Sequence, residues 1–370
     1  IIFGLENLGL SKEEISRRLT YIIDTFSLNS FLQRAPHSLS GGEQQKIALA
    51  AIMARQPKVL VLDEPFSMLD VQAAAHLMEY LMKLSQLGTS IVAFEHRSEY
   101  FEDIPQIRKK LLNGHQRTTP IPHPNYRQLP VFSKSHNAEI LQVKDLSVRL
   151  SGKTIVNRLN FELRGGTLTA IVGRNGSGKT TLLRALAGLQ PHDGTVTIGS
   201  DRPNLGLVYQ NADLQLFNPT VKEEILFRIP DPDMALYHSI LEVLGLTIYQ
   251  DTQPLLLSEG EKKRVALASV LMRQPEHGIL LDEPSLGQDI LHKEMLVQLS
   301  NALTRIGKIV VMTTHDLSLA AQADEIILLR ESGIVAQGPT DQILKNDSSW
   351  DEVGLFVPEW VTNPQGWDHV

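Results

Sequence analysis

Short apolar segments bounded by polar residues recur along the chain, and each has the length of a buried β-strand. They are residues 91–94, 167–172, 278–283 and 309–312. Strands that are apolar on both faces are typical of parallel sheets covered by helices. Residues 182–187 read Leu-Leu-Arg-Ala-Leu-Ala and favour a helix shortly after the second segment. The pattern therefore predicts an α/β fold with a mostly parallel sheet.

The chain also contains an internal repeat. Residues 39–43 read LSGGE and recur as LSEGE, LDEP occurs twice, and in each copy a histidine follows an apolar run. The paired positions are Ser40 and Ser258, Glu64 and Glu283, and His96 and His315, which lie 218, 219 and 219 residues apart. Three motifs in register at one spacing establish two tandem copies of one pattern.

A phosphate-binding loop lies only in the second copy. Residues 173–180 read GRNGSGKT and match G-x-x-x-x-G-K-[ST] between the predicted strand and helix. Its glycines let backbone N–H groups converge on phosphate oxygens at a helix N-terminus. Lys179 would pair with the β- and γ-phosphates of ATP, and Thr180 would supply a hydroxyl to Mg²⁺. The predicted ATP-binding residues of this loop are Gly173, Arg174, Asn175, Gly176, Ser177, Gly178, Lys179, Thr180 and Thr181.

Two acids end the strand at 278–283, and such acids face the ligand crevice of a parallel sheet. Asp282 suits the hydration shell of Mg²⁺, and Glu283 can polarise the attacking water. His315, after the next strand, would hold the γ-phosphate, the water and Glu283 in place. The recurrence of the acids as Asp63 and Glu64 argues against a solvated strand end.

The repeat predicts four segments. Residues 1–112 are the C-terminal part of the first copy, and 138–345 are a complete second copy. Between them, residues 113–137 are rich in Pro, His, Thr and Arg and read as a linker. Residues 346–370 form a tail with all three tryptophans, which we expect to dock on its own domain. A phosphate loop at the equivalent place in the first copy would fall before residue 1, so we expect an N-terminally truncated chain.

Composition excludes several kinds of partner and site. The formal net charge is −7, which argues against a nucleic-acid partner, since phosphate backbones attract basic surfaces. The chain has no cysteine, which excludes disulfides and thiolate metal sites. Its apolar runs are shorter than the roughly 18 residues that a membrane-spanning helix needs, so we expect any membrane role to be peripheral.

These motifs resemble the ATP-binding-cassette (ABC) family over nearly the whole chain. Residues 173–181 resemble its Walker A motif, 279–283 its Walker B motif and 39–43 its signature. The resemblance implies two P-loop ATPase cassettes, each with a mostly parallel sheet and a helical signature subdomain, the first cassette being incomplete. It also implies head-to-tail pairing of the cassettes, with each ATP held between a phosphate loop and the opposite signature.

The resemblance thus predicts two unequal sites. Ser40, Gly41, Gly42 and Glu43 would complete the ATP site that contains Lys179 and Glu283. The second, incomplete site would contain Asp63, Glu64, His96, Ser258 and Gly260. Its signature has Glu259 where the family has glycine, so a carboxylate would approach the phosphates there. We therefore predict that hydrolysis takes place at the first of these sites.

A narrower resemblance is to the ATPases of energy-coupling-factor (ECF) transporters. It rests on VYQNADLQLF at 208–217, TVKEEI at 220–225 and FGLENLG at 3–9. It implies vitamin or metal-ion uptake at the cytoplasmic face of the membrane, together with integral membrane coupling and substrate-binding subunits. Gln210 would contact Mg²⁺ and the attacking water, and residues 211–217 would face the membrane subunit. Leu150 departs from the family, which usually stacks an aromatic residue on adenine near this position.

Three other readings are open. A soluble twin-cassette protein acting on the ribosome usually has an Asn-His-Leu-Asp D-loop, whereas this chain has Ser-Met-Leu-Asp at 67–70 and Leu-Gly-Gln-Asp at 286–289. A twin-cassette sugar importer usually has an Asn inserted in the signature, which residues 39–45 lack. In a regulatory subunit without activity, Lys179 and Glu283 would have no role in binding or hydrolysing ATP. The ECF-type reading fits the motifs best.

Overall fold

The computed structural model describes residues 1–35, 39, 41–63, 65–66, 71–86, 88–94, 130, 132, 139–285, 290–331, 333–355 and 357. Several predicted positions lie outside these residues, namely Ser40, Glu64, His96, Trp360, Trp367 and nearly all of the linker. The chain divides into two compact units, unit 1 (Ile1–Ile107) and unit 2 (Arg108–Val370). Each unit is described by itself.

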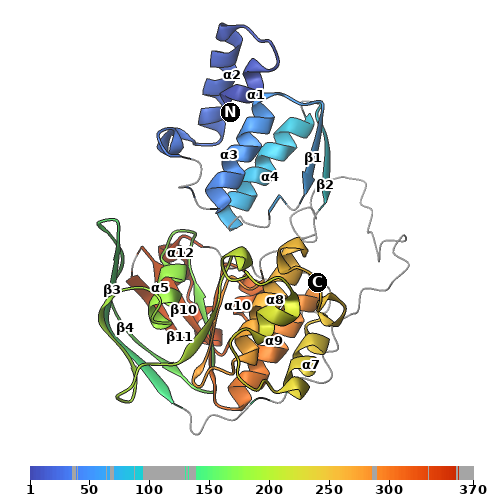
Figure 1. Ribbon diagram of the computed structural model, residues 1–370. Helices are drawn as coiled ribbons and strands as arrows, with labels where there is room; N and C mark the ends of the chain where they lie inside the picture. The colour runs from blue at the N-terminus through green and yellow to red at the C-terminus, as the bar shows by residue number, and fades with distance from the viewer. Residues whose placement is uncertain are drawn as a thin grey trace. The chain divides into compact units, whose positions relative to one another are not determined.

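Unit 2 is built on a six-stranded sheet, which confirms the predicted α/β fold (Figure 1). The strand order is β11-β10-β5-β9-β8-β7, and every neighbouring pair is parallel except β10 and β11. The strands are β5 (Leu168–Val172), β7 (Leu205–Val208), β8 (Gly278–Asp282), β9 (Ile309–Thr314), β10 (Glu325–Arg330) and β11 (Gly333–Pro339). Strands β5, β8 and β9 contain no exposed residue, which agrees with their continuous apolar sequences.

A second, antiparallel sheet covers one face of the central sheet together with helix α5 (Lys179–Leu186). Its order is β4-β3-β6, with β3 (Ile140–Leu150), β4 (Lys153–Arg164) and β6 (Asp193–Ile198). Leu182 and Leu183 of α5 share a buried cluster with strands of both sheets. The pleat places Leu280 of β8 in this cluster, while its neighbours Ile279 and Leu281 lie in the core on the opposite face.

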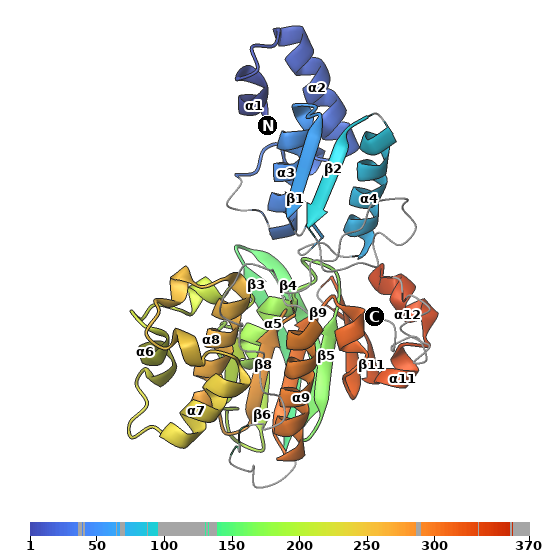
Figure 2. The same ribbon diagram turned by 90° about the vertical axis from the view of Figure 1, so that its right-hand side faces the viewer.

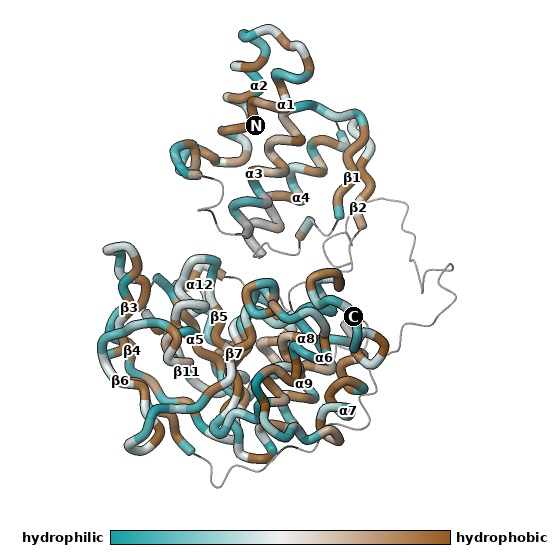
Figure 3. The backbone as a smooth tube through the Cα atoms, viewed as in Figure 1, coloured by the Kyte–Doolittle hydropathy of each residue, from teal (hydrophilic) through white to brown (hydrophobic). Residues whose placement is uncertain are grey.

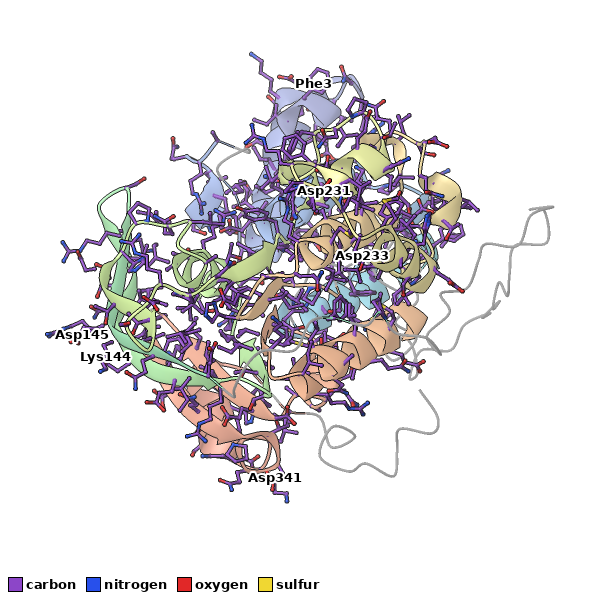
Figure 4. All side chains as sticks on the ribbon, turned by 60° about the horizontal axis from the view of Figure 1, so that its bottom comes forward. Phe3, Lys144, Asp145, Asp231, Asp233 and Asp341 are labelled. Atoms are coloured by element: carbon purple, nitrogen blue, oxygen red, sulfur yellow. The ribbon has the colours of Figure 1, made fainter. Side chains whose placement is uncertain are left out.

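Helices cover that opposite face (Figure 2). They include α6 (Val221–Leu226), α7 (Met234–Val243), α8 (Glu259–Met272) and α9 (Ile290–Arg305), with short 3₁₀ turns η4 (Ala212–Leu214), η5 (Thr247–Tyr249) and η6 (Pro254–Leu256). Asp233, labelled in Figure 4, begins α7, because its carboxylate accepts from the amides of Ala235 and Leu236 at 2.9 and 3.1 Å. No helix in the described part of the chain is long and apolar enough to cross a membrane.

Helices α11 (Thr340–Ile343) and α12 (Asp347–Val353) pack against β10 and β11 at one edge of the central sheet. Helix α10 (Leu317–Ala320) packs against the inner strands β5 and β9. Trp350 is buried in the main core of unit 2, and its indole N–H donates to the carbonyl of Ile343 at 2.8 Å. Residues 346–355 of the tail therefore pack on unit 2, and the expected docking of the rest of 346–370 lies outside the described residues apart from residue 357.

Unit 1 contains a parallel pair of strands and a set of helices. Strand β1 (Val59–Asp63) pairs with β2 (Ser90–Phe94), and the helices are α1 (Ile2–Glu6), α2 (Lys12–Thr25), η1 (Asn29–Phe31), α3 (Gly41–Ala54) and α4 (Val71–Gln86). One buried cluster joins Leu60 and Leu62 of β1 to residues of α1, α2, α3 and α4. Ser11 caps α2 by accepting from the amide of Glu14 at 3.3 Å.

The other face of β1 and β2 is apolar and exposed. Val61 and Val92 are 61% and 46% exposed, and Figure 3 shows both strands as hydrophobic. At the spacing of the repeat these residues correspond to Leu280 and Val311 of unit 2, which have no exposed surface. The same sequence positions therefore lie under α5 and the antiparallel sheet in unit 2, but face solvent in unit 1.

This difference predicts unequal costs for matched substitutions. Leu280→Ala should lower the free energy of unfolding of unit 2 by about 2–5 kcal/mol, because it leaves a cavity in a fully buried layer. Val61→Ala should change the stability of unit 1 by less than about 0.5 kcal/mol, because its side chain is mostly in water. Hydrogen exchange of β8 and β1, measured by mass spectrometry, reports each unit separately. Equal protection losses in the two strands would contradict the assignment of their environments.

Candidate nucleotide-binding and catalytic site

The loop between β5 and α5 requires glycine at specific positions. Gly178, the N-cap residue of α5, has a φ of +99°, a backbone conformation that other residues adopt at a cost. A Cβ on Gly173 would lie 2.3 Å from the carbonyl oxygen of Leu329, so only glycine fits against β10. The loop therefore turns tightly at the carboxyl end of β5, and the N-terminus of α5 is directed to the same edge of the sheet.

Lys179 is buried and held by this loop. Its ammonium donates to the carbonyl oxygens of Gly173 and Arg174 at 2.7 and 3.2 Å. It also lies 3.6 Å from Oε1 of Glu283. The structure thus brings together the predicted phosphate-binding cation and the predicted catalytic carboxylate, 104 residues apart in the sequence.

Asp282 and Thr180 form the oxygen-rich part of the site. Oδ1 of Asp282 accepts from the hydroxyls of Thr180 at 3.1 Å and Thr313 at 2.7 Å. Burial raises the pKa of Asp282, and the two hydroxyl donors oppose that shift only in part. A hydroxyl and a carboxylate side by side fit the oxygen ligands that Mg²⁺ prefers, so these residues would hold the ion.

Glu283 is buried, and β9 and His315 orient it. Its Oε2 lies 2.9 Å from Nδ1 of His315 and accepts from the amide of His315 at 3.3 Å. Burial opposes ionisation, but His315 and Lys179 outweigh it, so the pKa of Glu283 is lowered and the carboxylate is charged. The predicted Glu283–His315 pair is present, joining the ends of β8 and β9.

Two buried polar atoms beside these groups have no hydrogen-bond partner within the described chain. They are Nε2 of His315 and the hydroxyl of Ser177. Buried polar atoms in folded proteins are nearly always paired, so orphans need an explanation. A phosphate group at the loop would supply acceptor oxygens to both. This is the structural observation that most directly favours a phosphate-bearing ligand at this site.

Gln210 is exposed and lies just after β7, at the same sheet edge as Asp282, because β7 and β8 are adjacent and parallel. Gln215, which was not among the predicted site residues, holds this segment in place. Its amide accepts from the N–H of Tyr209 at 3.4 Å and donates to the carbonyl of Ala266 at 3.3 Å. Gln215 therefore connects the segment after β7 to helix α8. No local sequence pattern predicts these contacts.

The signature of unit 2 opens α8 with a capping box. The hydroxyl of Ser258 caps the helix, and Glu261 returns to the Ser258 amide at 2.8 Å. The carboxylate of Glu259, which is expected to approach a phosphate in the paired site, lies 3.0 Å from the ammonium of Lys262. Lys262 also pairs with Asp213 at 2.9 Å, so it links α8 to η4. The extra carboxylate of this signature is thus accompanied by a cation.

In unit 1 the signature glycines Gly41 and Gly42 are the first residues of α3. Glu43 accepts from the guanidinium of Arg34 at 3.1 Å. Asp63 ends β1 and is exposed. Because each unit is described by itself, the pairing of this signature with the loop of unit 2 stays a prediction.

Comparison with known proteins supplies the family. The model of the family described as "ABC transporter" matches residues 4–67 and 156–286. The chain belongs to the ABC transporter family. Members of this family are generally ATP-hydrolysing, and its matched segments include the phosphate loop and β8 of this chain.

Relatives of this ABC protein are also named as ATP-binding proteins of transporters. A putative ABC transporter ATP-binding protein of Methanosarcina mazei is 32% identical over 368 residues, covering 91% of this chain and 74% of the relative. The putative HMP/thiamine import ATP-binding protein YkoD of Bacillus subtilis is 29% identical and covers 98% and 76% of the two chains.

Among solved structures, cbiO1 of Clostridium perfringens matches with a TM-score of 0.50 and 25% identity, covering 62% of this chain and all of cbiO1. This protein is described as part of the ABC transporter complex cbiONQ. These names are of transport proteins and do not favour the ribosomal alternative.

Proposed function

We propose that this ABC protein is the ATP-hydrolysing subunit of an ECF-type importer for a vitamin or a metal ion. The proposal is carried by the segment 208–225, which follows β7 and resembles the corresponding segment of ECF ATPases. Relatives named for thiamine import and for the cbiONQ complex support this class of transporter. A peripheral position at the cytoplasmic face of the membrane is part of the proposal.

ATP would bind by displacing the internal contacts of Lys179. The lysine exchanges the carbonyl oxygens of Gly173 and Arg174 for the β- and γ-phosphates, while loop amides and the N-terminus of α5 receive the remaining oxygens. Thr180, Asp282 and Gln210 would hold Mg²⁺, which when bound offsets phosphate charge and orients the leaving group.

Glu283 then polarises the attacking water. Its carboxylate is charged and is held by the amide of His315, so it can accept a hydrogen bond from water at a fixed place. Nε2 of His315 has no partner among the described residues and would donate to the γ-phosphate. The same imidazole thus positions both reacting groups, which lowers the entropic cost of reaching the transition state.

The second half of this site would come from the signature of unit 1. Ser40 and the amides of Gly41 and Gly42 at the start of α3 would bring another helix N-terminus to the γ-phosphate. The complementary site would combine Ser258 and Gly260 with Asp63, Glu64 and His96. Since the chain has one loop of the pattern GxxxxGK[ST], in unit 2, we propose that hydrolysis depends on the first pairing.

The membrane subunit would dock beside the segment after β7. Leu214 and Phe217 are 67% and 64% exposed there. The Phe217 ring stacks edge-on against Phe227 at 4.9 Å, and buried Glu224 accepts from the Phe217 and Asn218 amides at 2.8 Å each. Apolar side chains on a rigid support favour a docking surface, and their closeness to Gln210 would couple docking to the ATP site.

Co-purification with the integral membrane subunits of the proposed transporter tests this proposal. Leu214→Asp combined with Phe217→Asp should abolish recovery of the complex in detergent, because two desolvated carboxylates would oppose docking. Leu189→Asp is the matched control, since Leu189 is 57% exposed and lies after α5. Retention of the complex by the double variant, or its loss in the control, would contradict the assignment of this surface.

A further inference from the structure

The backbone of Glu283 is in an unfavourable conformation. Its φ is +47°, in the left-handed region that residues with a Cβ rarely adopt. Non-glycine residues persist there only when their surroundings fix them, and such positions cluster at functional sites. The direction of the Glu283 carboxylate therefore depends on the groups that hold its peptide.

Among the described residues, two elements hydrogen-bond to this backbone. From β9, the carbonyl and hydroxyl oxygens of Thr313 both accept from the amide of Glu283, at 3.1 Å each. From α8, the ammonium of Lys263 donates to the carbonyl oxygen of Glu283 at 3.2 Å. The carbonyl contact is the one that comes from outside the central sheet.

Lys263 lies in the protein interior. Its residue is 8% exposed, and it lines a cavity of about 20 Å³ together with Tyr209, Leu267, Pro284 and Met295. Burial lowers the pKa of Lys263 to about 8, although the carboxylates of Glu283, Glu259 and Asp282 favour its charged form. An apolar side chain would fill this space at a lower desolvation cost, so packing alone does not account for a lysine here.

We propose that Lys263 is a positioning residue for ATP hydrolysis, whose ammonium fixes the left-handed peptide of Glu283 and so aims the catalytic carboxylate. The inference rests on the ATPase function proposed above. Lys263 is on the same helix as the Ser258 cap, five residues further on. A displacement of the signature end of α8 is therefore passed to Glu283 through one side chain.

The test compares three variants of the full chain. Lys263→Met removes the donor but keeps the length and apolar character of the side chain. Lys263→Gln keeps a donor, and glutamine stands at the corresponding position of the first copy, Gln45. Lys262→Met is the matched control, because Lys262 is the neighbouring lysine and pairs with Asp213 and Glu259 instead.

The readouts are kcat and KM for ATP, the Kd for MgATP, and the melting temperature. Lys263→Met should lower kcat by about 10- to 100-fold, as expected for a small misplacement of a catalytic group. The Kd for MgATP and the melting temperature should both stay near their wild-type values. Lys263→Gln should recover part of the lost kcat, and Lys262→Met should keep the wild-type kcat.

Other results would overturn the proposal. If Lys263→Met keeps the wild-type kcat, or loses nucleotide binding and thermal stability in proportion to kcat, Lys263 does not position Glu283. Failure of Lys263→Gln to recover any activity would equally contradict a role through hydrogen bonding. If the wild-type chain has no ATPase activity, the proposed function itself is refuted. The wild-type measurement alone shows this outcome, so it is distinguishable from a failure of the Lys263 proposal.

Discussion

Glu283→Gln is expected to lower the kcat of ATP hydrolysis by about 10²- to 10⁴-fold, the usual contribution of a general base. The amide keeps the shape of the side chain and can still contact His315, but it cannot take a proton from water. MgATP should therefore remain bound, because Lys179 and the loop amides are unchanged. Single-turnover hydrolysis and equilibrium binding of a fluorescent ATP analogue separate the two effects.

Glu64→Gln is the control that the repeat supplies, since Glu64 occupies the same place in the motif of the first copy. It should reduce kcat much less, because in the proposed pairing Glu64 belongs to the site without a phosphate loop in this chain. Equal losses in the two variants would refute the inequality of the sites. Loss of MgATP binding in Glu283→Gln would place the residue in binding instead of catalysis.

The sequence predicted which residues of unit 2 lie together at one edge of its central sheet, because its motifs combine local rules. A buried strand, a glycine loop and a helix start are each visible within a few residues, and their order fixes which side chains reach the ligand crevice. The structure places Lys179, Asp282, Glu283 and His315 together, within hydrogen-bond or ion-pair distance of at least one of the others or of Thr180. The chemical roles of these residues remain predictions.

The interactions that orient those residues could not be read from the sequence. Lys263 and Thr313 act on Glu283 across 20 and 30 residues, and no periodic pattern connects them. The left-handed φ of Glu283 has no sequence signal either, since such residues are usually Gly or Asn. The pairing of Glu259 with Lys262 follows from helical spacing, and that signal was available in the sequence.

Lys179→Ala should have the largest effect on nucleotide binding. Removing one partner of a buried charge pair costs about 2–5 kcal/mol, which corresponds to a Kd for MgATP raised by roughly 30- to 4,000-fold. The loop itself should persist, because its shape is set by Gly173 against β10 and by Gly178 at the start of α5. The tryptophan fluorescence of buried Trp350 reports whether unit 2 is still folded.

Arg174→Ala is the matched control for this prediction, because it removes a cation from the same loop. The side chain of Arg174 is exposed, and solvent screening limits such charges to about 1 kcal/mol, or roughly fivefold in Kd. A large ratio between the two losses means that ATP is bound by specific coordination at a buried lysine. If the two variants weaken binding equally, the loop attracts nucleotide by its overall charge, and the proposed exchange of Lys179 from the loop carbonyls to the phosphates is wrong.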